Sequence, residues 1–140
     1  MSSHHQNTEK IVQAMAEDTN METCKISELR NINLSDYDCI GFASGIDFRK
    51  FYLEIENFAR EKLPLQKEVF FLYTCAMDRE GFTNSIKEIA LEKDAVVLGA
   101  YGCRGYNTYG PWKLIGGMNK SHPTKNEIQE CVNFYEKLLI

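Results

Sequence analysis

Hydroxyl and amide side chains gather at the start of the chain, directly before a stretch with helical periodicity. The run Ser2–Thr8 leads into Asn7–Asp18, where Ile11, Val12 and Met15 share one face. The first N–H groups of a helix and its dipole attract anions, and neighbouring hydroxyls add hydrogen-bond donors. This pattern predicts a phosphate site, although an ordinary helix cap would use the same residue types. The His4-His5 pair lacks further ligands at metal spacing, so no metal site is predicted.

A second polar loop follows the apolar run Asp38–Ala43. Gly45 permits a tight turn whose backbone can approach a planar ligand, and the Ser44 hydroxyl can donate a hydrogen bond. Phe48 could present a ring face to that ligand. In the alternative interpretation, Asp47 caps the following helix and Phe48 lies in the core.

A third loop follows the apolar run Glu68–Thr74. Its candidates are the Thr74 hydroxyl and the backbone around Cys75, which could meet the polar edge of a ring. Arg104, after a later apolar run, could pair with an anion. Cys75 could be a nucleophile, but no base is placed beside it, which favours a structural thiol.

The elements that position these loops alternate along the chain. Apolar runs predict strands at Asp38–Ala43, Glu68–Thr74 and Ala95–Ala100, with a weaker candidate at Glu22–Ile26. Helical periodicity covers Asn7–Asp18, Asp47–Lys62, Phe82–Lys93 and a last helix after Thr124, which forms a capping box with Glu127 and buries Ile128, Cys131, Val132, Tyr135, Leu138 and Leu139. Such alternation predicts an α/β fold with a parallel sheet covered by helices on both faces. Ligands of such sheets bind beyond the carboxyl ends of the strands.

Bulk properties narrow the class of protein. The chain has 140 residues and a net charge of −4, which predicts one domain over residues 1–140 without a basic surface for nucleic acid. Its five cysteines form no CxxC pair, as expected of reduced thiols in a cytoplasmic protein. No apolar run is long enough to span a membrane.

Three stretches together resemble the flavodoxin-like family. Ser-x-x-x-Asn-Thr at Ser3–Thr8 is similar to the family's phosphate loop, with Gln6 where the family has glycine. Asp38–Ile46 resembles the strand and loop beside the flavin ring. Gly105–Pro123 resembles a segment of a bacterial and archaeal branch. Tyrosines and Trp112 in the longer stretch Tyr101–Pro123 predict an ordered loop near the ligand, unless these rings simply cap the core.

The resemblance implies a doubly wound sheet of order 2-1-3-4-5 with flavin mononucleotide (FMN) at the switch point. It places the phosphate at Ser3, His5, Asn7 and Thr8. It places the ring between Ser44, Gly45, Ile46 and Phe48 on one side and Thr74, Cys75, Ala76, Met77 and Asp78 on the other. It also implies electron transfer to a redox protein partner or a small acceptor.

One departure from the family concerns its first strand, which is apolar, central and runs into the phosphate loop. Only Met1 and Ser2 precede Ser3 here, so this strand is expected to be missing. Another chain could fill the gap, or the natural protein could start earlier. Open sheet edges predict a homo-oligomer, and a phosphate loop without its strand predicts weak FMN binding or none.

Two alternatives to a flavin-binding electron carrier stay open. The first is a flavin-free module of the same fold that self-associates and acts as an interaction or structural protein. The second is a small hydrolase or reductase that uses Cys75 or Cys103.

Overall fold

A four-stranded sheet forms the centre of the computed structural model, which describes residues 7–29, 31–77, 79–104 and 123–139. The strands are β1 (Cys39–Asp47), β2 (Lys50–Phe51), β3 (Glu68–Cys75) and β4 (Val96–Arg104), in the order β2-β1-β3-β4. β1 runs parallel to β3, and β3 runs parallel to β4. The prediction that three adjacent parallel strands form one sheet is confirmed.

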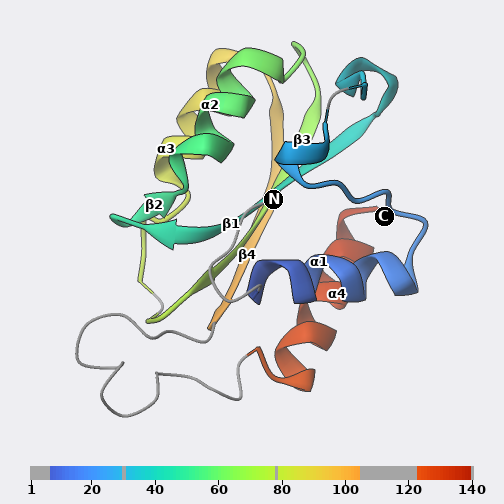
Figure 1. Cartoon of the computed structure of the whole chain (residues 1–140), viewed down its shortest axis with the longest axis vertical. Helices are drawn as coiled ribbons and strands as arrows, with labels where there is room; N and C mark the ends of the chain where they lie inside the picture. The colour runs from blue at the N-terminus through green and yellow to red at the C-terminus, as the bar shows by residue number, and fades with distance from the viewer. Residues whose placement is uncertain (1–6, 30, 78, 105–122, 140) are drawn as a thin grey trace.

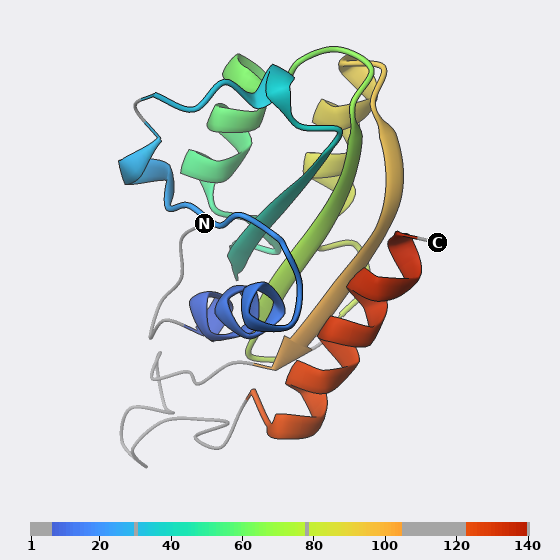
Figure 2. The same ribbon diagram turned by 90° about the vertical axis from the view of Figure 1, so that its right-hand side faces the viewer.

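Helices cover both faces of this sheet (Figures 1 and 2). Helices α2 (Leu53–Lys62) and α3 (Asn84–Glu92) pack on one face, and α1 (Asn7–Asp18) and α4 (Lys125–Leu138) pack on the other. The predicted α/β fold class is therefore confirmed. The capping box at the start of α4 is also present, since the Thr124 hydroxyl accepts from the Glu127 N–H and the Glu127 carboxylate accepts from the Thr124 N–H.

The sheet separates two apolar cores because β3 is apolar on both faces. Phe71 is fully buried on the side of α2 and α3, where its ring meets Phe51 edge-on at a centroid distance of 6.0 Å. Phe70 is buried on the other side, among residues of α1 and α4. The predicted inward face of α1 is buried as expected, whereas Leu139, which was predicted to be buried, is exposed just after α4 ends at Leu138.

The predicted helix Asp47–Lys62 is wrong over its first six residues. β1 continues to Asp47 and turns back into β2, and α2 begins only at Leu53. Phe48 and Arg49 both have positive φ, 48° and 63°, which is the geometry of a tight two-residue hairpin turn. Asp47 is therefore a strand residue rather than a helix cap.

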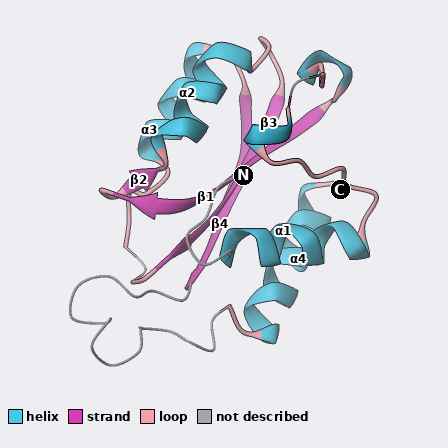
Figure 3. Cartoon of the chain, viewed as in Figure 1, coloured by secondary structure: helices cyan, strands magenta, loops and turns pink. Residues whose placement is uncertain are grey.

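The predicted strand Glu22–Ile26 is also wrong. Residues 21–25 form an extended loop, drawn in pink in Figure 3, and Ile26–Glu28 forms a 3₁₀ turn, η2, followed by a second one, η3 (Leu34–Asp36). A strand needs a hydrogen-bonded neighbour, and this segment meets none in the described part of the chain. The stretch before α1, where the family's first strand would run into the phosphate loop, lies outside the described residues.

Candidate functional site

The three loops singled out in the sequence converge where the parallel strands end. In the sheet register Gly45 of β1 lies beside Thr74 of β3, and Thr74 lies beside Cys103 of β4. The start of α1 reaches the same place, because Thr8 Oγ1 lies 2.9 Å from Thr74 Oγ1 in a buried hydroxyl–hydroxyl hydrogen bond. Figure 1 shows α1 beginning close to the ends of β3 and β4. The site therefore stands at the carboxyl edge of the sheet.

The first loop is only partly described. Ser3 and His5 lie outside the described residues, whereas Asn7 and Thr8 form the first turn of α1 and are both buried. α1 is 12 residues long, and its first turn lies against Thr74 at this edge of the sheet. Its N-terminal N–H groups and the positive end of its dipole therefore face this edge. Thr8 fixes that end of the helix against β3.

The second loop owes its shape to contacts within the protein. The buried Ser44 hydroxyl donates to the Gly45 carbonyl at 2.6 Å and accepts from the Tyr52 N–H at 2.9 Å. A Cβ atom on Gly45 would lie 2.5 Å from the Tyr52 phenol oxygen. Ser44 and Gly45 therefore position the β1–β2 hairpin, and the glycine leaves room for Tyr52.

Phe48 stands at the tip of that hairpin with 90% of its surface exposed, so the interpretation that placed its ring in the core is wrong. Ile46 is half-buried and pairs with Phe51 in the hairpin. The exposed Phe48 ring is available to a planar partner at the mouth of the site.

In the third loop, exposure increases along the chain. Thr74 and Cys75 are buried, Ala76 is half-buried and Met77 is exposed. Asp78 lies outside the described residues, and the structure describes only the backbone of Arg104. The part of this loop that leaves the sheet therefore presents an apolar thioether to solvent.

The thiols near the site have no features of nucleophiles. Cys75 Sγ donates to the Cys103 carbonyl at 3.6 Å, and both thiols are reduced and buried. Burial raises the pKa of the Cys103 thiol far above its usual range, which keeps it protonated at neutral pH. The hydrolase alternative through Cys103 has no support in this geometry.

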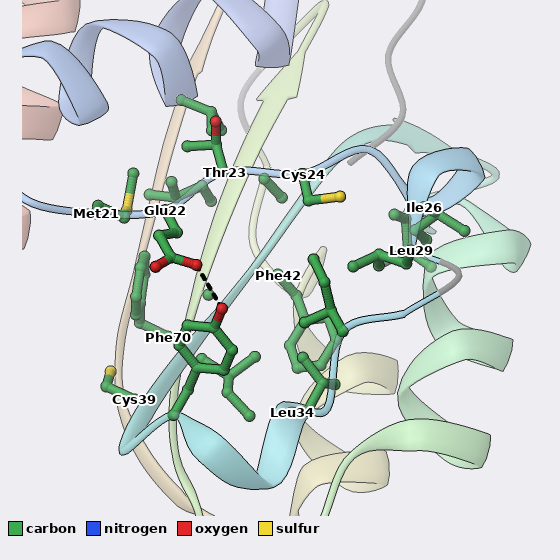
Figure 4. A pocket seen from close by; sticks show the side chains of 18 of the residues that line it. Met21, Glu22, Thr23, Cys24, Ile26, Leu29, Leu34, Cys39, Phe42 and Phe70 are labelled. Carbon is green, nitrogen blue, oxygen red and sulfur yellow. Dashed lines mark hydrogen bonds between the residues drawn. The ribbon is translucent and has the colours of Figure 1, made fainter.

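A groove of about 420 Å³ lies along the edge of β1 that does not face β3 (Figure 4), and sequence reasoning missed it. It contains none of the candidate site residues. Its outer wall is the loop Asn20–Cys24, and its inner wall is Cys39–Ala43 of β1. Gly41 in the middle of a strand is the signal that could have indicated an accessible backbone.

Two further kinds of site are absent from the described residues. No group of three or more His, Cys, Asp or Glu side chains is arranged there as metal ligands. No helix of the described chain has the length and apolar character needed to cross a membrane.

Comparisons with known proteins define the class. A profile of the flavodoxin domain matches residues 1–96, and the chain belongs to this flavodoxin family. An uncharacterized protein of Methanocaldococcus jannaschii is 34% identical over 140 residues, which cover 99% of this chain and 93% of the relative. Membership supports an FMN-type role in electron transfer in general.

Solved flavodoxins share the fold. A flavodoxin from the domain Archaea superposes with a TM-score of 0.63 at 19% identity, covering 99% of this chain and 95% of that one. Two-electron reduced Megasphaera elsdenii flavodoxin gives a TM-score of 0.60 at 15% identity, covering 94% and 93% of the two chains.

The described residues fit FMN chemically. A phosphate needs N–H donors at a helix N-terminus, which the first turn of α1 supplies. A flavin ring needs apolar or aromatic surface beside it, which exposed Phe48 and Met77 supply at the same edge of the sheet.

Proposed function

We propose that this protein binds FMN at the carboxyl edge of its sheet and passes electrons to a redox protein or a small acceptor. Bound FMN would supply the redox chemistry, and the chain would hold and orient it. Ser3, His5, Asn7 and Thr8 are the proposed phosphate loop. Ser44, Gly45, Ile46 and Phe48, together with Thr74, Cys75, Ala76, Met77 and Asp78, are proposed to flank the ring.

The observation that carries this proposal is the buried contact between Thr8 and Thr74. Their hydroxyl oxygens lie 2.9 Å apart, although the residues are 66 positions apart in the chain. The contact holds the positive end of the α1 dipole beside the loop that follows β3. An anionic phosphate and a ring joined by a short chain need these two places to be adjacent.

A titration with FMN, followed by flavin fluorescence and by the visible absorbance of the bound flavin, tests this proposal. We expect the chain to bind FMN weakly, with a Kd of roughly micromolar magnitude. Thr8→Val and Thr74→Val should each weaken binding about tenfold, because each removes the hydrogen bond that positions α1. Thr83→Val is the matched control, since Thr83 is a buried threonine at the start of α3 with no side-chain capping bond. Absence of binding at millimolar FMN by the folded protein would contradict the proposal.

The choice of acceptor is a separate question. The net charge of −4 favours a basic protein partner, since opposite charges steer association. Oxidation of the reduced, FMN-loaded protein by cytochrome c, which is basic, should slow as salt rises. Ferricyanide, a small anion, should show no such slowing. We also propose a cytoplasmic location, where five cysteines outside disulfides stay reduced.

A second candidate function is a flavin-free module that self-associates. The observation that favours it is the outer edge of β4, which pairs only with β3 among the described strands and carries the 56% exposed Val96. If it holds, the mass in solution should be that of a dimer or larger, and Val96→Lys should reduce it to a monomer. Leu91→Lys, at an exposed position on α3, is the control that should change nothing.

A further inference from the structure

One charged side chain is buried in the part of the chain that the structure describes, the carboxylate of Glu56 in α2. It is inaccessible to water, and neither of its oxygens accepts a hydrogen bond from a described residue. Two cations lie near its Oε2 atom, with Lys50 Nζ at 4.0 Å and Arg60 Nη2 at 3.9 Å. Both distances exceed that of a hydrogen bond, so the attraction is between separated charges.

The burial of this carboxylate opposes folding. A carboxylate loses its hydration when it is buried, and long ion pairs without hydrogen bonds recover only part of that loss. A glutamine side chain has the same shape and loses less hydration in the same place. Stability alone therefore does not account for a charge at Glu56, and such departures from good packing are expected where a residue serves a site.

The two cations connect Glu56 to different elements. Arg60 lies one turn further along α2, and its guanidinium also donates to the Asn57 side chain of the same helix at 3.1 Å. Its contact with Glu56 therefore stays within α2. Lys50 belongs to β2 and reaches Glu56 from the hairpin that follows β1. Of the two contacts, only that of Lys50 joins the hairpin to the helix.

The hairpin of β1 and β2 needs support from outside itself. It has two residue pairs, and the pair nearest its tip joins Asp47 to Lys50. The turn residues Phe48 and Arg49 have positive φ, a conformation that costs residues other than glycine free energy. Phe51 anchors β2 in the core, but the tip extends beyond it. A tether at Lys50 would restrain that tip.

We propose that Glu56 is a positioning residue for the candidate FMN site. Its buried charge would hold Lys50, and through Lys50 the hairpin tip, so that the Phe48 ring keeps a fixed place beside the carboxyl edge of the sheet. Glu56 itself would not touch the flavin. The part played by Phe48 rests on the proposed function, whereas the link between α2 and the hairpin does not.

Two other roles of Glu56 would act on α2 alone. Glu56 lies in the first turn of α2, where a negative charge stabilises a helix through its dipole. It also stands four residues before Arg60, the spacing at which opposite charges support a helix. Either role would leave the order of the hairpin unchanged when the charge is removed, so the hairpin is the place to measure.

Amide hydrogen exchange of the FMN-free chain tests the link. Glu56→Gln keeps the side-chain shape and removes the charge, so exchange at Ile46–Phe51 should quicken about threefold to fivefold. The urea midpoint of unfolding should not fall, because a buried charge is removed and the two cations left behind are about half exposed. Glu54→Gln, an exposed glutamate in the same first turn, is the matched control and should not change hairpin exchange.

Substitution of the cations separates the two contacts. Lys50→Met should quicken exchange of the hairpin as much as Glu56→Gln does, whereas Arg60→Met should not change it. Lys50→Arg keeps the positive charge and should keep exchange slow. In the double variant of Lys50→Met and Glu56→Gln the two effects should not add, since both remove one contact. Lys50→Met also decides the link if Glu56→Gln fails to fold.

Titration with FMN then connects the link to the site. Glu56→Gln and Lys50→Met should each raise the Kd for FMN about threefold, and Glu54→Gln should leave it unchanged. Unchanged hairpin exchange in the first two variants would overturn the link. Quicker exchange with an unchanged Kd would overturn the role of Glu56 at the FMN site. Absence of FMN binding by the unaltered chain would contradict the proposed function and with it that role, while hairpin exchange still decides the link.

Discussion

The two edges of β1 have opposite surroundings. Along one edge, Cys39–Gly45 forms an unbroken parallel ladder with β3, and the apolar side chains around it are closely packed. Along the other edge, the strand faces a groove whose far wall is a loop. The same strand therefore belongs to a completed core on one side and to an accessible surface on the other.

The difference separates stability from binding. A paired edge has little capacity for new partners, because its backbone groups and side chains are already satisfied. An open edge contributes less to stability and can accept a strand. If this division holds, substitutions beside the paired edge should lower stability more than substitutions along the groove.

Truncation on the packed side should have the largest effect. Phe71 is fully buried and its ring contacts those of Phe42 and Phe51, so Phe71→Ala should reduce the free energy of unfolding by about 3–5 kcal/mol. Ile32→Ala, in the groove lining and 40% exposed, should cost under about 1 kcal/mol. Urea unfolding measures both, and similar losses for the two variants would show that the groove side is packed as firmly as the β3 side.

Two glycines allow a finer comparison. A Cβ atom on Gly102 would lie 2.1 Å from Cζ of Tyr73, and one on Gly41 would lie 2.4 Å from Cζ of Phe70. Tyr73 is held by Phe51 and Phe82, so Gly102→Ala should cost about 1–3 kcal/mol. Phe70 also packs against Phe134 and Tyr135, but it lines the groove, and if the groove gives its ring room to shift, Gly41→Ala should cost less. An equal or larger cost for Gly41→Ala would mean that the groove provides no room for the ring.

The sequence predicted the packed side better than the open side. Continuous apolar runs such as Glu68–Thr74 have one stable place, a strand buried on both faces, and the adjacent parallel strands of one sheet followed from them. The convergence of Thr8, Gly45 and Thr74 also followed, because the carboxyl ends of parallel strands share one edge. These parts depend on local pattern and on chain connectivity.

The errors lie around the open edge and the hairpin. Glu22–Ile26 has the composition of a strand, but a strand also requires a neighbour, which a local pattern does not reveal. The turn at Phe48 and Arg49 lacks the glycine or asparagine that usually marks positive φ. It depends instead on Ser44 accepting from the Tyr52 N–H, a contact eight residues apart. The groove lies between the Glu22 loop and β1 and was not predicted.

Alkaline pH should weaken the apolar core between the sheet and helices α1 and α4. Burial raises the pKa of Cys131, which contacts Met15 between α1 and α4, to about 12. Because this pKa is raised, the protonated thiol contributes fully to the free energy of unfolding below the pKa of the unfolded thiol, near 9. This contribution is lost as the pH rises toward 12. The loss should approach about 1.4 kcal/mol per pH unit within that window.

Cys131→Ala tests this assignment through unfolding measured between pH 8 and 11. It should flatten the decline of stability with pH, even though it lowers stability at pH 8. Val132→Ala, the neighbouring buried residue that does not titrate, should lower stability without changing the decline. Equal slopes for the two variants would remove Cys131 as a cause.

The smallest expected effect lies at the open side, in the contact between Tyr37 and Glu22. The hydrogen bond to the Glu22 carboxylate raises the pKa of Tyr37, because the charged partner favours the protonated phenol. Glu22→Gln should therefore lower that pKa toward its ordinary value. Spectrophotometric titration of the phenols detects the change, with Tyr37→Phe identifying which step belongs to this residue. Because the contact joins the loop wall of the groove to Tyr37, two residues before β1, the same substitution should also speed alkylation of Cys39. A lowered pKa with unchanged alkylation would show that this hydrogen bond does not restrain the wall, and that the groove keeps its shape through apolar packing alone.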